Sequence, residues 1–232
     1  MLGLPDNVKA CLFDLDGVLT QTAKVHAAAW KQMFDAFLRE RPGPFVPFDS
    51  VRDYDEYVDG RPRNDGVRSF LTSRGIELGE DEVVELGNRK NELVLNLIHE
   101  QGVQPYEGSV RYVHAARDGG LRRAVVSSST NAHDVLAAAG ISDLFEQVVD
   151  GHLAEREHLN GKPAPDTFLA GARALEVEPA DAAVFEDALA GVEAGRAGAF
   201  GCVVGVDRVG QADALRDHGA NVVVSDLAEL LR

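Results

Sequence analysis

Apolar residues gather along much of the chain in short runs that end in acidic or hydroxyl-bearing residues. Val8 to Phe13 (VKACLF) is followed by Asp14 and then by Gly17. This pattern predicts a strand buried on both faces and, after it, a tight turn. Five later runs are expected to be strands of the same kind: Arg122 to Val126, Phe145 to Val149, Ala182 to Phe185, Phe200 to Val204 and Asn221 to Val224.

The segments between these runs repeat their apolar positions with the spacing of a helix. Strands that alternate with helices form parallel sheets covered on both sides. The pattern therefore predicts an α/β fold, a Rossmann-like doubly wound parallel sheet. Helices are expected at about Ser109 to Arg117, Asn131 to Ala139, Asp166 to Leu175, Ala188 to Ala197 and Gln211 to Asp217, with a last one from Asp226.

One long stretch, residues 22–101, shows helical periodicity and no convincing strand. A crossover between parallel strands typically needs only about a dozen residues or somewhat more. We therefore interpret residues 22–101 as an inserted helical cap domain, and residues 1–21 and 102–232 as the α/β catalytic core. The insertion leaves directly after the first strand, so it should stand like a lid over the carboxyl ends of the strands, where such sheets bind ligands. Its helices are expected at Val25 to Arg39, Asn64 to Ser73 and Glu80 to His99.

Charge limits the possible partners. Among 232 residues there are 23 Lys and Arg against 38 Asp and Glu, which gives a net charge of −15. Long-range attraction of nucleic acid is disfavoured by this balance, so we expect no nucleic-acid partner. A phosphorylated ligand would also be repelled at long range. Any anion site must be built locally from lysine, arginine, backbone N–H groups or a metal ion.

The remaining composition is that of an ordinary globular protein, with 45% hydrophobic and 26% charged residues. Neither a basic apolar leader nor an apolar run long enough to span a membrane is apparent. Cys11 and Cys202 lie inside apolar runs and are expected to be buried, reduced thiols. These features favour a cytoplasmic protein with no membrane partner.

Two acidic pairs follow predicted strands. Asp14 and Asp16 are one residue apart, so at an extended strand end both side chains would point the same way. Glu186 and Asp187 follow the run Ala182 to Phe185. Either pair alone has a simpler interpretation, since acidic residues are common in turns and at helix N-termini. If the two strands are neighbours, four carboxylates converge, and Mg²⁺ would relieve their repulsion.

A serine cluster and a lysine complete the candidate site. Ser127, Ser128 and Ser129 follow the strand Arg122 to Val126. They could simply cap the next helix, or they could bind a phosphoryl group with hydroxyl and N–H groups. Lys162 precedes Pro163-Ala164-Pro165-Asp166. It could be a surface residue, or this stiff segment could hold it beside the carboxylates, where it would neutralise charge during phosphoryl transfer.

With these segments in this order, the chain resembles the haloacid dehalogenase superfamily of phosphotransferases over nearly its whole length. The resemblance implies that Asp14 attacks phosphorus to form an aspartyl-phosphate, while Asp16 is the general acid/base. It implies Mg²⁺ held by the side chains of Asp14 and Asp187 and the backbone carbonyl of Asp16. Glu186 would support the metal directly or through water. Ser127 and Lys162 match the remaining catalytic positions.

Within the superfamily the resemblance is to the sugar-phosphate mutases known as β-phosphoglucomutases. Their threonine and histidine at the positions of Thr22 and His26 position the acid/base aspartate, and their arginine at the position of Arg63 grips the phosphate that is not transferred. Each of these residues also has a purely structural interpretation. His26 could be a buried helix residue, Trp30 could serve only to pack the cap, and Arg63 could be a solvated loop charge. The expected substrate-binding residues are Thr22, His26, Trp30, Gly60, Arg63, Lys90, Ser128, Ser129 and Asn131.

This resemblance implies an enzyme of carbohydrate metabolism that interconverts β-glucose 1-phosphate and glucose 6-phosphate through glucose 1,6-bisphosphate. A monomer is expected, and the sequence leaves the oligomeric state open. A sugar-phosphate or small-metabolite phosphatase with the same site is the alternative, and a non-enzymatic binding protein is a more distant one. The sequence departs from the family at three positions. Thr130 stands where a lysine beside the distal phosphate is frequent, Gly66 where serine is common, and Gln21 where the family has an acidic residue.

Overall fold

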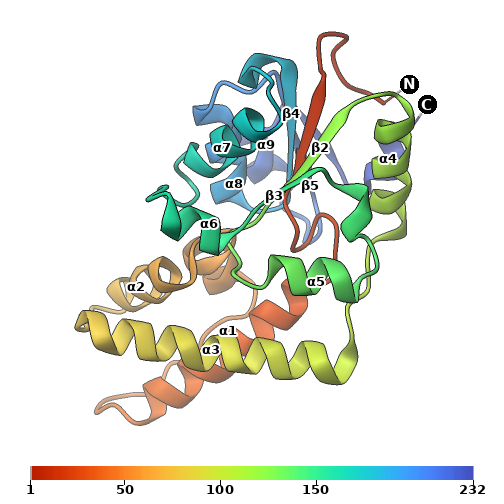
Figure 1. Ribbon diagram of the computed structural model, residues 1–232. Helices are drawn as coiled ribbons and strands as arrows, with labels where there is room; N and C mark the ends of the chain where they lie inside the picture. The colour runs from red at the N-terminus through yellow and green to blue at the C-terminus, as the bar shows by residue number, and fades with distance from the viewer. Residues whose placement is uncertain (1, 232) are drawn as a thin grey trace.

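The computed structural model describes residues 2–231, and in them six parallel strands form one sheet in the order β3-β2-β1-β4-β5-β6 (Figure 1). This confirms the predicted doubly wound α/β fold. β1 is central and pairs in parallel with both β2 and β4. The strands are β1 (Ala10–Phe13), β2 (Arg122–Val126), β3 (Gln147–Val149), β4 (Ala182–Glu186), β5 (Cys202–Val206) and β6 (Val222–Val224).

Helices cover both faces of the sheet because successive strand residues point to opposite sides. Phe13 packs with Tyr112 of α4 on one face. Leu12 packs with Phe168 of α7 on the other. α4 (Glu107–Asp118), α5 (Ala132–Ala138) and the 3-10 turn η4 (Leu227–Leu230) lie on the first face, whereas α7 (Asp166–Ala174), α8 (Leu189–Ala197) and α9 (Ala212–His218) lie on the second.

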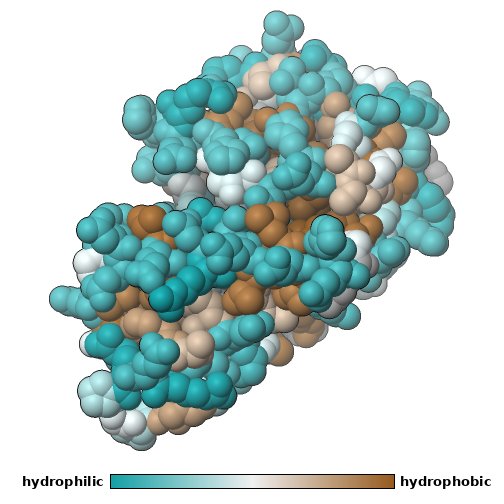
Figure 2. Space-filling view, turned by 60° about the horizontal axis from the view of Figure 1, so that its bottom comes forward, coloured by the Kyte–Doolittle hydropathy of each residue, from teal (hydrophilic) through white to brown (hydrophobic). Residues whose placement is uncertain are grey.

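The inserted segment has a hydrophobic core of its own. Phe34 lies at its centre, with its ring centroid 4.3 Å from that of Phe70 and 5.2 Å from that of Phe48. The molecule therefore has two lobes, with a notch between them (Figure 2). These contacts support the proposed cap of residues 22–101. Its elements are α1 (Ala23–Arg39), the π-helix η1 (Tyr54–Val58), α2 (Arg63–Ser73) and α3 (Glu80–Gln101).

Several element boundaries differ from the predicted ones by a residue or two, as helix and strand ends often do. β5 is displaced by two residues at both ends, since it spans Cys202–Val206 rather than Phe200 to Val204. The Phe200 N–H instead bonds the Gly195 carbonyl at the end of α8, and the Gly201 N–H bonds the Pro179 carbonyl. The last predicted helix is only a 3-10 turn, capped by the Asp226 carboxylate.

Among residues 2–231, two elements of five or more residues were missed by the sequence patterns. α6 (Gly151–Arg156) is one of them, and its N-terminus is capped by Asp150, which accepts from the Leu153 N–H at 2.8 Å. The π-helix η1 is the other. Both expected thiols, Cys11 and Cys202, are buried and free. None of the helices in residues 2–231 combines the length and the apolar character needed to cross a membrane.

Candidate active site

The strand register brings the four predicted segments to one edge of the sheet. The Asp14 N–H donates to the carbonyl of Phe185 in β4 at 2.9 Å, so Asp14 and Asp16 lie beside Glu186 and Asp187. The Ser127 N–H donates in the same way to the carbonyl of Val149 in β3. Carboxyl ends of parallel strands meet at one edge, which explains why residues from distant parts of the chain converge here.

Lys162 is buried at the centre of this edge. Its Nζ lies 2.5 Å from Asp14 Oδ1, 2.6 Å from Glu186 Oε1 and 3.1 Å from the carbonyl oxygen of Val126. The interpretation as a surface lysine is therefore wrong. Burial by itself would lower the pKa of Lys162, but the carboxylates of Asp14 and Glu186 raise it above its usual value. Lys162 is thus a fixed positive charge beside the candidate nucleophile.

Asp14, Glu186 and Asp187 form the group that could hold a metal ion, with candidate ligand oxygens all within 4.8 Å of one another. Burial raises the pKa of Asp187, and the neighbouring carboxylates raise it further. Burial also raises the pKa of Asp14, with Glu186 and Asp16 adding to the shift and Lys162 opposing it. A hard divalent cation would offset this excess of buried negative charge. The donor set therefore fits Mg²⁺.

The members of this group are not equivalent. One oxygen of Glu186 accepts from Lys162, and the other accepts from the Ala188 N–H at 2.9 Å. Glu186 thus holds Lys162 and the β4–α8 turn, which suits a supporting role. The Asp16 side chain lies outside the group, so only its backbone carbonyl remains as the metal ligand expected from the resemblance.

Gly17 allows Asp187 to approach the first loop. Its φ is +86°, and a Cβ at this position would lie 1.7 Å from Asp187 Oδ2. Any other residue would both strain the backbone and displace this carboxylate. The glycine that follows the first acidic pair therefore makes room for the second.

The Asp16 side chain is held by donors from the start of the cap. The Thr22 hydroxyl donates to Asp16 Oδ1, and His26 Nε2 lies 3.5 Å from the same oxygen. Lys90 Nζ, from α3, lies 2.9 Å from His26 Nδ1. Burial and then Lys90 lower the pKa of His26 to about 4, although Asp16 acts in the opposite direction. A neutral His26 that accepts from Lys90 carries its proton on Nε2, facing Asp16.

Lys90 and Trp30 form part of the cap wall of the site. Lys90 Nζ lies 4.8 Å from the centre of the Trp30 ring. Burial lowers the pKa of Lys90 to about 7; Asp16 opposes this shift and Arg63 adds to it. An anion bound in the cavity would raise the pKa of Lys90 and favour its charged form. Trp30 both packs the cap core and lines the cavity.

A cavity of about 810 Å³ lies between the cap and the core. The Ser128 hydroxyl donates to the Gly60 carbonyl at 2.8 Å, and the Asn131 amide donates to Asn91 at 2.9 Å. The cap is therefore in contact with the core across the site. Twelve of the predicted site residues line the cavity: Asp14, Asp16, His26, Trp30, Gly60, Arg63, Lys90, Ser127, Ser128, Ser129, Lys162 and Asp187.

The structure leaves some predicted residues outside the cavity and adds others. Thr22, Asn131 and Glu186 do not line it but hold residues that do. Sequence analysis missed Asp59 and Arg61, which flank Gly60 and line the cavity. The signal that could have found them is the dense charge around this glycine in VDGRPRND.

Mg²⁺ is expected to stabilise the folded protein, and to do so more strongly at higher pH. The raised pKa values of Asp14 and Asp187 mean that the folded protein without metal keeps protons that the unfolded chain releases, so this site loses stability as pH rises above about 4. Mg²⁺ replaces those protons. At saturating Mg²⁺ we expect the free energy of unfolding to increase by about 1–3 kcal/mol at pH 8 and by less at pH 5.

Chemical denaturation with EDTA or with Mg²⁺ measures this difference at each pH. Asp187→Asn is the control variant, because it removes one proposed ligand and one buried charge. It should fold and should lose most of the Mg²⁺ effect. Equal stabilisation at both pH values, or an undiminished effect in the variant, would show that Mg²⁺ acts elsewhere.

Comparisons with known proteins agree with this geometry. Residues 8–198 match the family model described as haloacid dehalogenase-like hydrolase. The chain is 55% identical to the β-phosphoglucomutase of Mycobacterium bovis, covering 100% of this chain and 94% of the relative. It is 34% identical to the β-phosphoglucomutase of Bacillus subtilis, covering 96% of this chain and 92% of the relative.

Solved structures show the same fold. The crystal structure of β-phosphoglucomutase from Clostridium difficile superimposes with a TM-score of 0.79 at 29% identity, covering 97% of this chain and 93% of that one. The family model covers most of the chain, and two relatives above 30% identity are matched over nearly their full length. The protein thus belongs to the haloacid dehalogenase-like hydrolase family.

Proposed function

We propose that this protein is a phosphomutase that interconverts β-glucose 1-phosphate and glucose 6-phosphate through an aspartyl-phosphate and a bound glucose 1,6-bisphosphate. The observation that carries the proposal is the shared cavity. It joins Asp14, at the end of β1, to Arg63 and Lys90 of the cap. A site with cationic groups on both the nucleophile side and the cap side suits a sugar with a phosphate at each end.

Phosphoryl transfer begins at Asp14. One of its oxygens attacks phosphorus in line, the bond from phosphorus to the sugar oxygen breaks, and Asp16 supplies the proton to that leaving oxygen. Lys162 stays beside Asp14 throughout and stabilises the charge on the phosphoryl oxygens. Ser127, which lines the cavity next to Asp14, is placed to donate its hydroxyl to the same oxygens. Mg²⁺, when held by Asp14, Asp187 and the Asp16 carbonyl, would supply further positive charge at the phosphoryl group.

The second half-reaction reverses the first at the other end of the sugar. The free hydroxyl of the sugar phosphate attacks the aspartyl-phosphate, its proton passes to the Asp16 carboxylate, and the bond from phosphorus to Asp14 breaks. The donors Thr22 and His26 hold Asp16 in place for this step. Because both come from the start of the cap, Asp16 is fully oriented only when the cap lies on the core.

Cap closure also supports transfer to a sugar rather than to water. The cap and core touch at Gly60 and Ser128 and at Asn91 and Asn131. These contacts limit entry of water to the aspartyl-phosphate. We propose that the enzyme works as a monomer, since all the site residues named here belong to one chain.

The decisive experiment is a turnover assay with β-glucose 1-phosphate, Mg²⁺ and a trace of glucose 1,6-bisphosphate. We expect glucose 6-phosphate to form far faster than inorganic phosphate. The α anomer of glucose 1-phosphate serves as the control substrate. Stoichiometric inorganic phosphate without glucose 6-phosphate would instead identify a sugar-phosphate phosphatase.

A further inference from the structure

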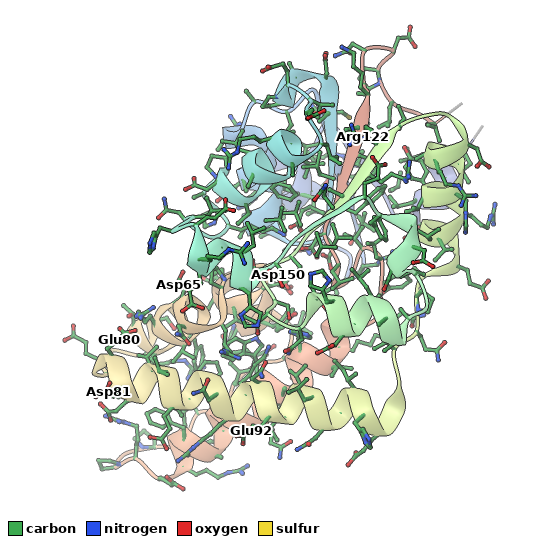
Figure 3. All side chains as sticks on the ribbon, viewed as in Figure 1. Asp65, Glu80, Asp81, Glu92, Arg122 and Asp150 are labelled. Atoms are coloured by element: carbon green, nitrogen blue, oxygen red, sulfur yellow. The ribbon has the colours of Figure 1, made fainter. Side chains whose placement is uncertain are left out.

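The cavity is lined by more cationic side chains than the sequence predicted. Some of these cations are already paired with protein groups and others are not. Lys162 is bonded to Asp14 and Glu186, and Lys90 is bonded to His26. Arg68 is bonded to Asp65 at 2.9 Å and also to Glu80. Figure 3 shows where Asp65 and Glu80 lie, on α2 and at the start of α3. These three cations already have protein partners.

Arg61 and Arg63 are different. Both line the cavity, and within residues 2–231 neither guanidinium has an ion pair or a hydrogen bond to another residue. The Nε atom of each is buried without a partner. A buried N–H group left without an acceptor is costly, so each guanidinium is suited to take an acceptor from a ligand.

The loop that carries Arg61 is pressed against the core on both sides of this residue. On one side, Gly60 has a φ of +69° and is so close to the core that a Cβ would lie 2.9 Å from Ala188 Cβ. On the other side, Pro62 lies against Gly161, where a Cβ would be 2.0 Å from Pro62 Cγ. Arg61 therefore enters the cavity as part of the cap segment that meets the core.

This loop also touches the turn where the family lysine is missing. The Ser128 hydroxyl donates to the Gly60 carbonyl, and Ser128 is two residues before Thr130. Threonine cannot supply a positive charge at that turn. An arginine on the adjoining cap loop can, and its planar fork matches two oxygens of a phosphate group.

We propose, building on the proposed function, that Arg61 binds the phosphate that is not being transferred, next to Arg63, and so supplies the cation that Thr130 lacks. Arg61 is then a binding residue for the distal phosphate of the sugar phosphate. Arg61 is carried by the cap, so a distal phosphate bound to it would link the cap to the core. A donor with a single phosphate makes no such link.

The test compares substrates with and without a distal phosphate. For Arg61→Ala, we expect kcat/KM with β-glucose 1-phosphate to fall about tenfold to a hundredfold, mainly through KM, which is the usual range for loss of a hydrogen bond to a charged group. Turnover of acetyl phosphate, which brings only the transferred phosphoryl group, should fall by a much smaller factor. Arg52→Ala is the matched control, because Arg52 is an exposed cap arginine that does not line the cavity.

Rescue separates phosphate binding from a structural role. Adding Thr130→Lys to Arg61→Ala places the cation on the core side, and we expect it to recover at least severalfold of the lost kcat/KM. Arg61→Lys should lose less than Arg61→Ala. Thermal unfolding of each variant shows whether it is folded.

The proposal is overturned if Arg61→Ala lowers the turnover of both substrates by the same factor or changes the turnover of neither. It is also overturned if Thr130→Lys does not restore kcat/KM with β-glucose 1-phosphate. These outcomes differ from failure of the proposed function, which shows in the wild type as phosphate release without glucose 6-phosphate. In that case the same comparison is made on phosphate released from glucose 1,6-bisphosphate, which keeps a distal phosphate, and from acetyl phosphate, which has none.

Discussion

Replacing Asp14 by asparagine is expected to lower mutase turnover by at least about ten-thousandfold, the order seen when a catalytic nucleophile is removed. The carboxamide has the shape of the carboxylate but is a much poorer nucleophile toward phosphorus. Asp14 is buried next to Lys162, so no other carboxylate can take its position without moving this lysine. Steady-state kinetics measures the loss, and mass spectrometry of enzyme treated with acetyl phosphate should show no phosphorylated species.

The stability of this variant provides an independent check. Burial raises the pKa of Asp14, so its charge is unfavourable in the absence of metal. Asp14→Asn should therefore be no less stable than the wild type in EDTA. Asp213→Asn is the matched control, because that side chain is 98% exposed and should not matter for turnover. Retention of more than about a hundredth of wild-type turnover in Asp14→Asn would rule out Asp14 as the nucleophile.

Replacing Lys162 by methionine is expected to lower the free energy of unfolding by about 3–5 kcal/mol in EDTA, the usual effect of removing one partner of a buried ion pair. Methionine fills a similar volume but leaves Asp14 and Glu186 without their cation. The remaining carboxylates can escape their repulsion only by taking up protons, so the loss should increase as pH rises. Chemical denaturation at two pH values measures both effects, and turnover should fall as well because the phosphoryl oxygens lose a counter-charge.

Lys9 provides a control of the same chemistry in another environment. Its Nζ lies 2.6 Å from Asp181, as Lys162 Nζ does from Glu186, but the Lys9 side chain is 66% exposed whereas that of Lys162 is 0% exposed. Lys9→Met should therefore cost only about 0–1 kcal/mol. Adding Glu186→Gln to Lys162→Met should recover part of the loss, since one unpaired charge is removed. Equal costs for the two lysines would mean that the burial of Lys162 does not determine its contribution.

The convergence of the two acidic pairs shows what local sequence patterns can predict about the site. Asp14 and Glu186 each follow an apolar run, and the alternation of strands and helices predicts a parallel sheet. In such a sheet all carboxyl ends share one edge, so convergence of the two pairs needed only that their strands be neighbours. β1 and β4 are neighbours, in register from Ala10 with Ala182 to Phe13 with Phe185.

The interior of the site was less predictable because it depends on side chains that meet over long sequence separations. Lys162 and Asp14 are 148 positions apart, and nothing in the local sequence around Lys162 distinguishes a surface lysine from a buried one. The contact between Lys90 and His26 spans 64 positions and joins two cap helices. Arg61 belongs to no motif, and only the contacts of its loop with the core bring it into the cavity.

The sequence by itself determined the α/β architecture, the position of the helical insertion and the residues at the strand ends, since periodicity and turn residues are local properties of the chain. Only the tertiary structure decided which of these charges are buried, which are paired and which remain free. Glu186 became a support for Lys162, and Asp16 was oriented by donors from the cap. Within residues 2–231, Arg61 and Arg63 were left without hydrogen-bond or ion-pair partners. The physical reason is that burial and ion pairing depend on how the cap packs on the core, and no local pattern specifies that packing.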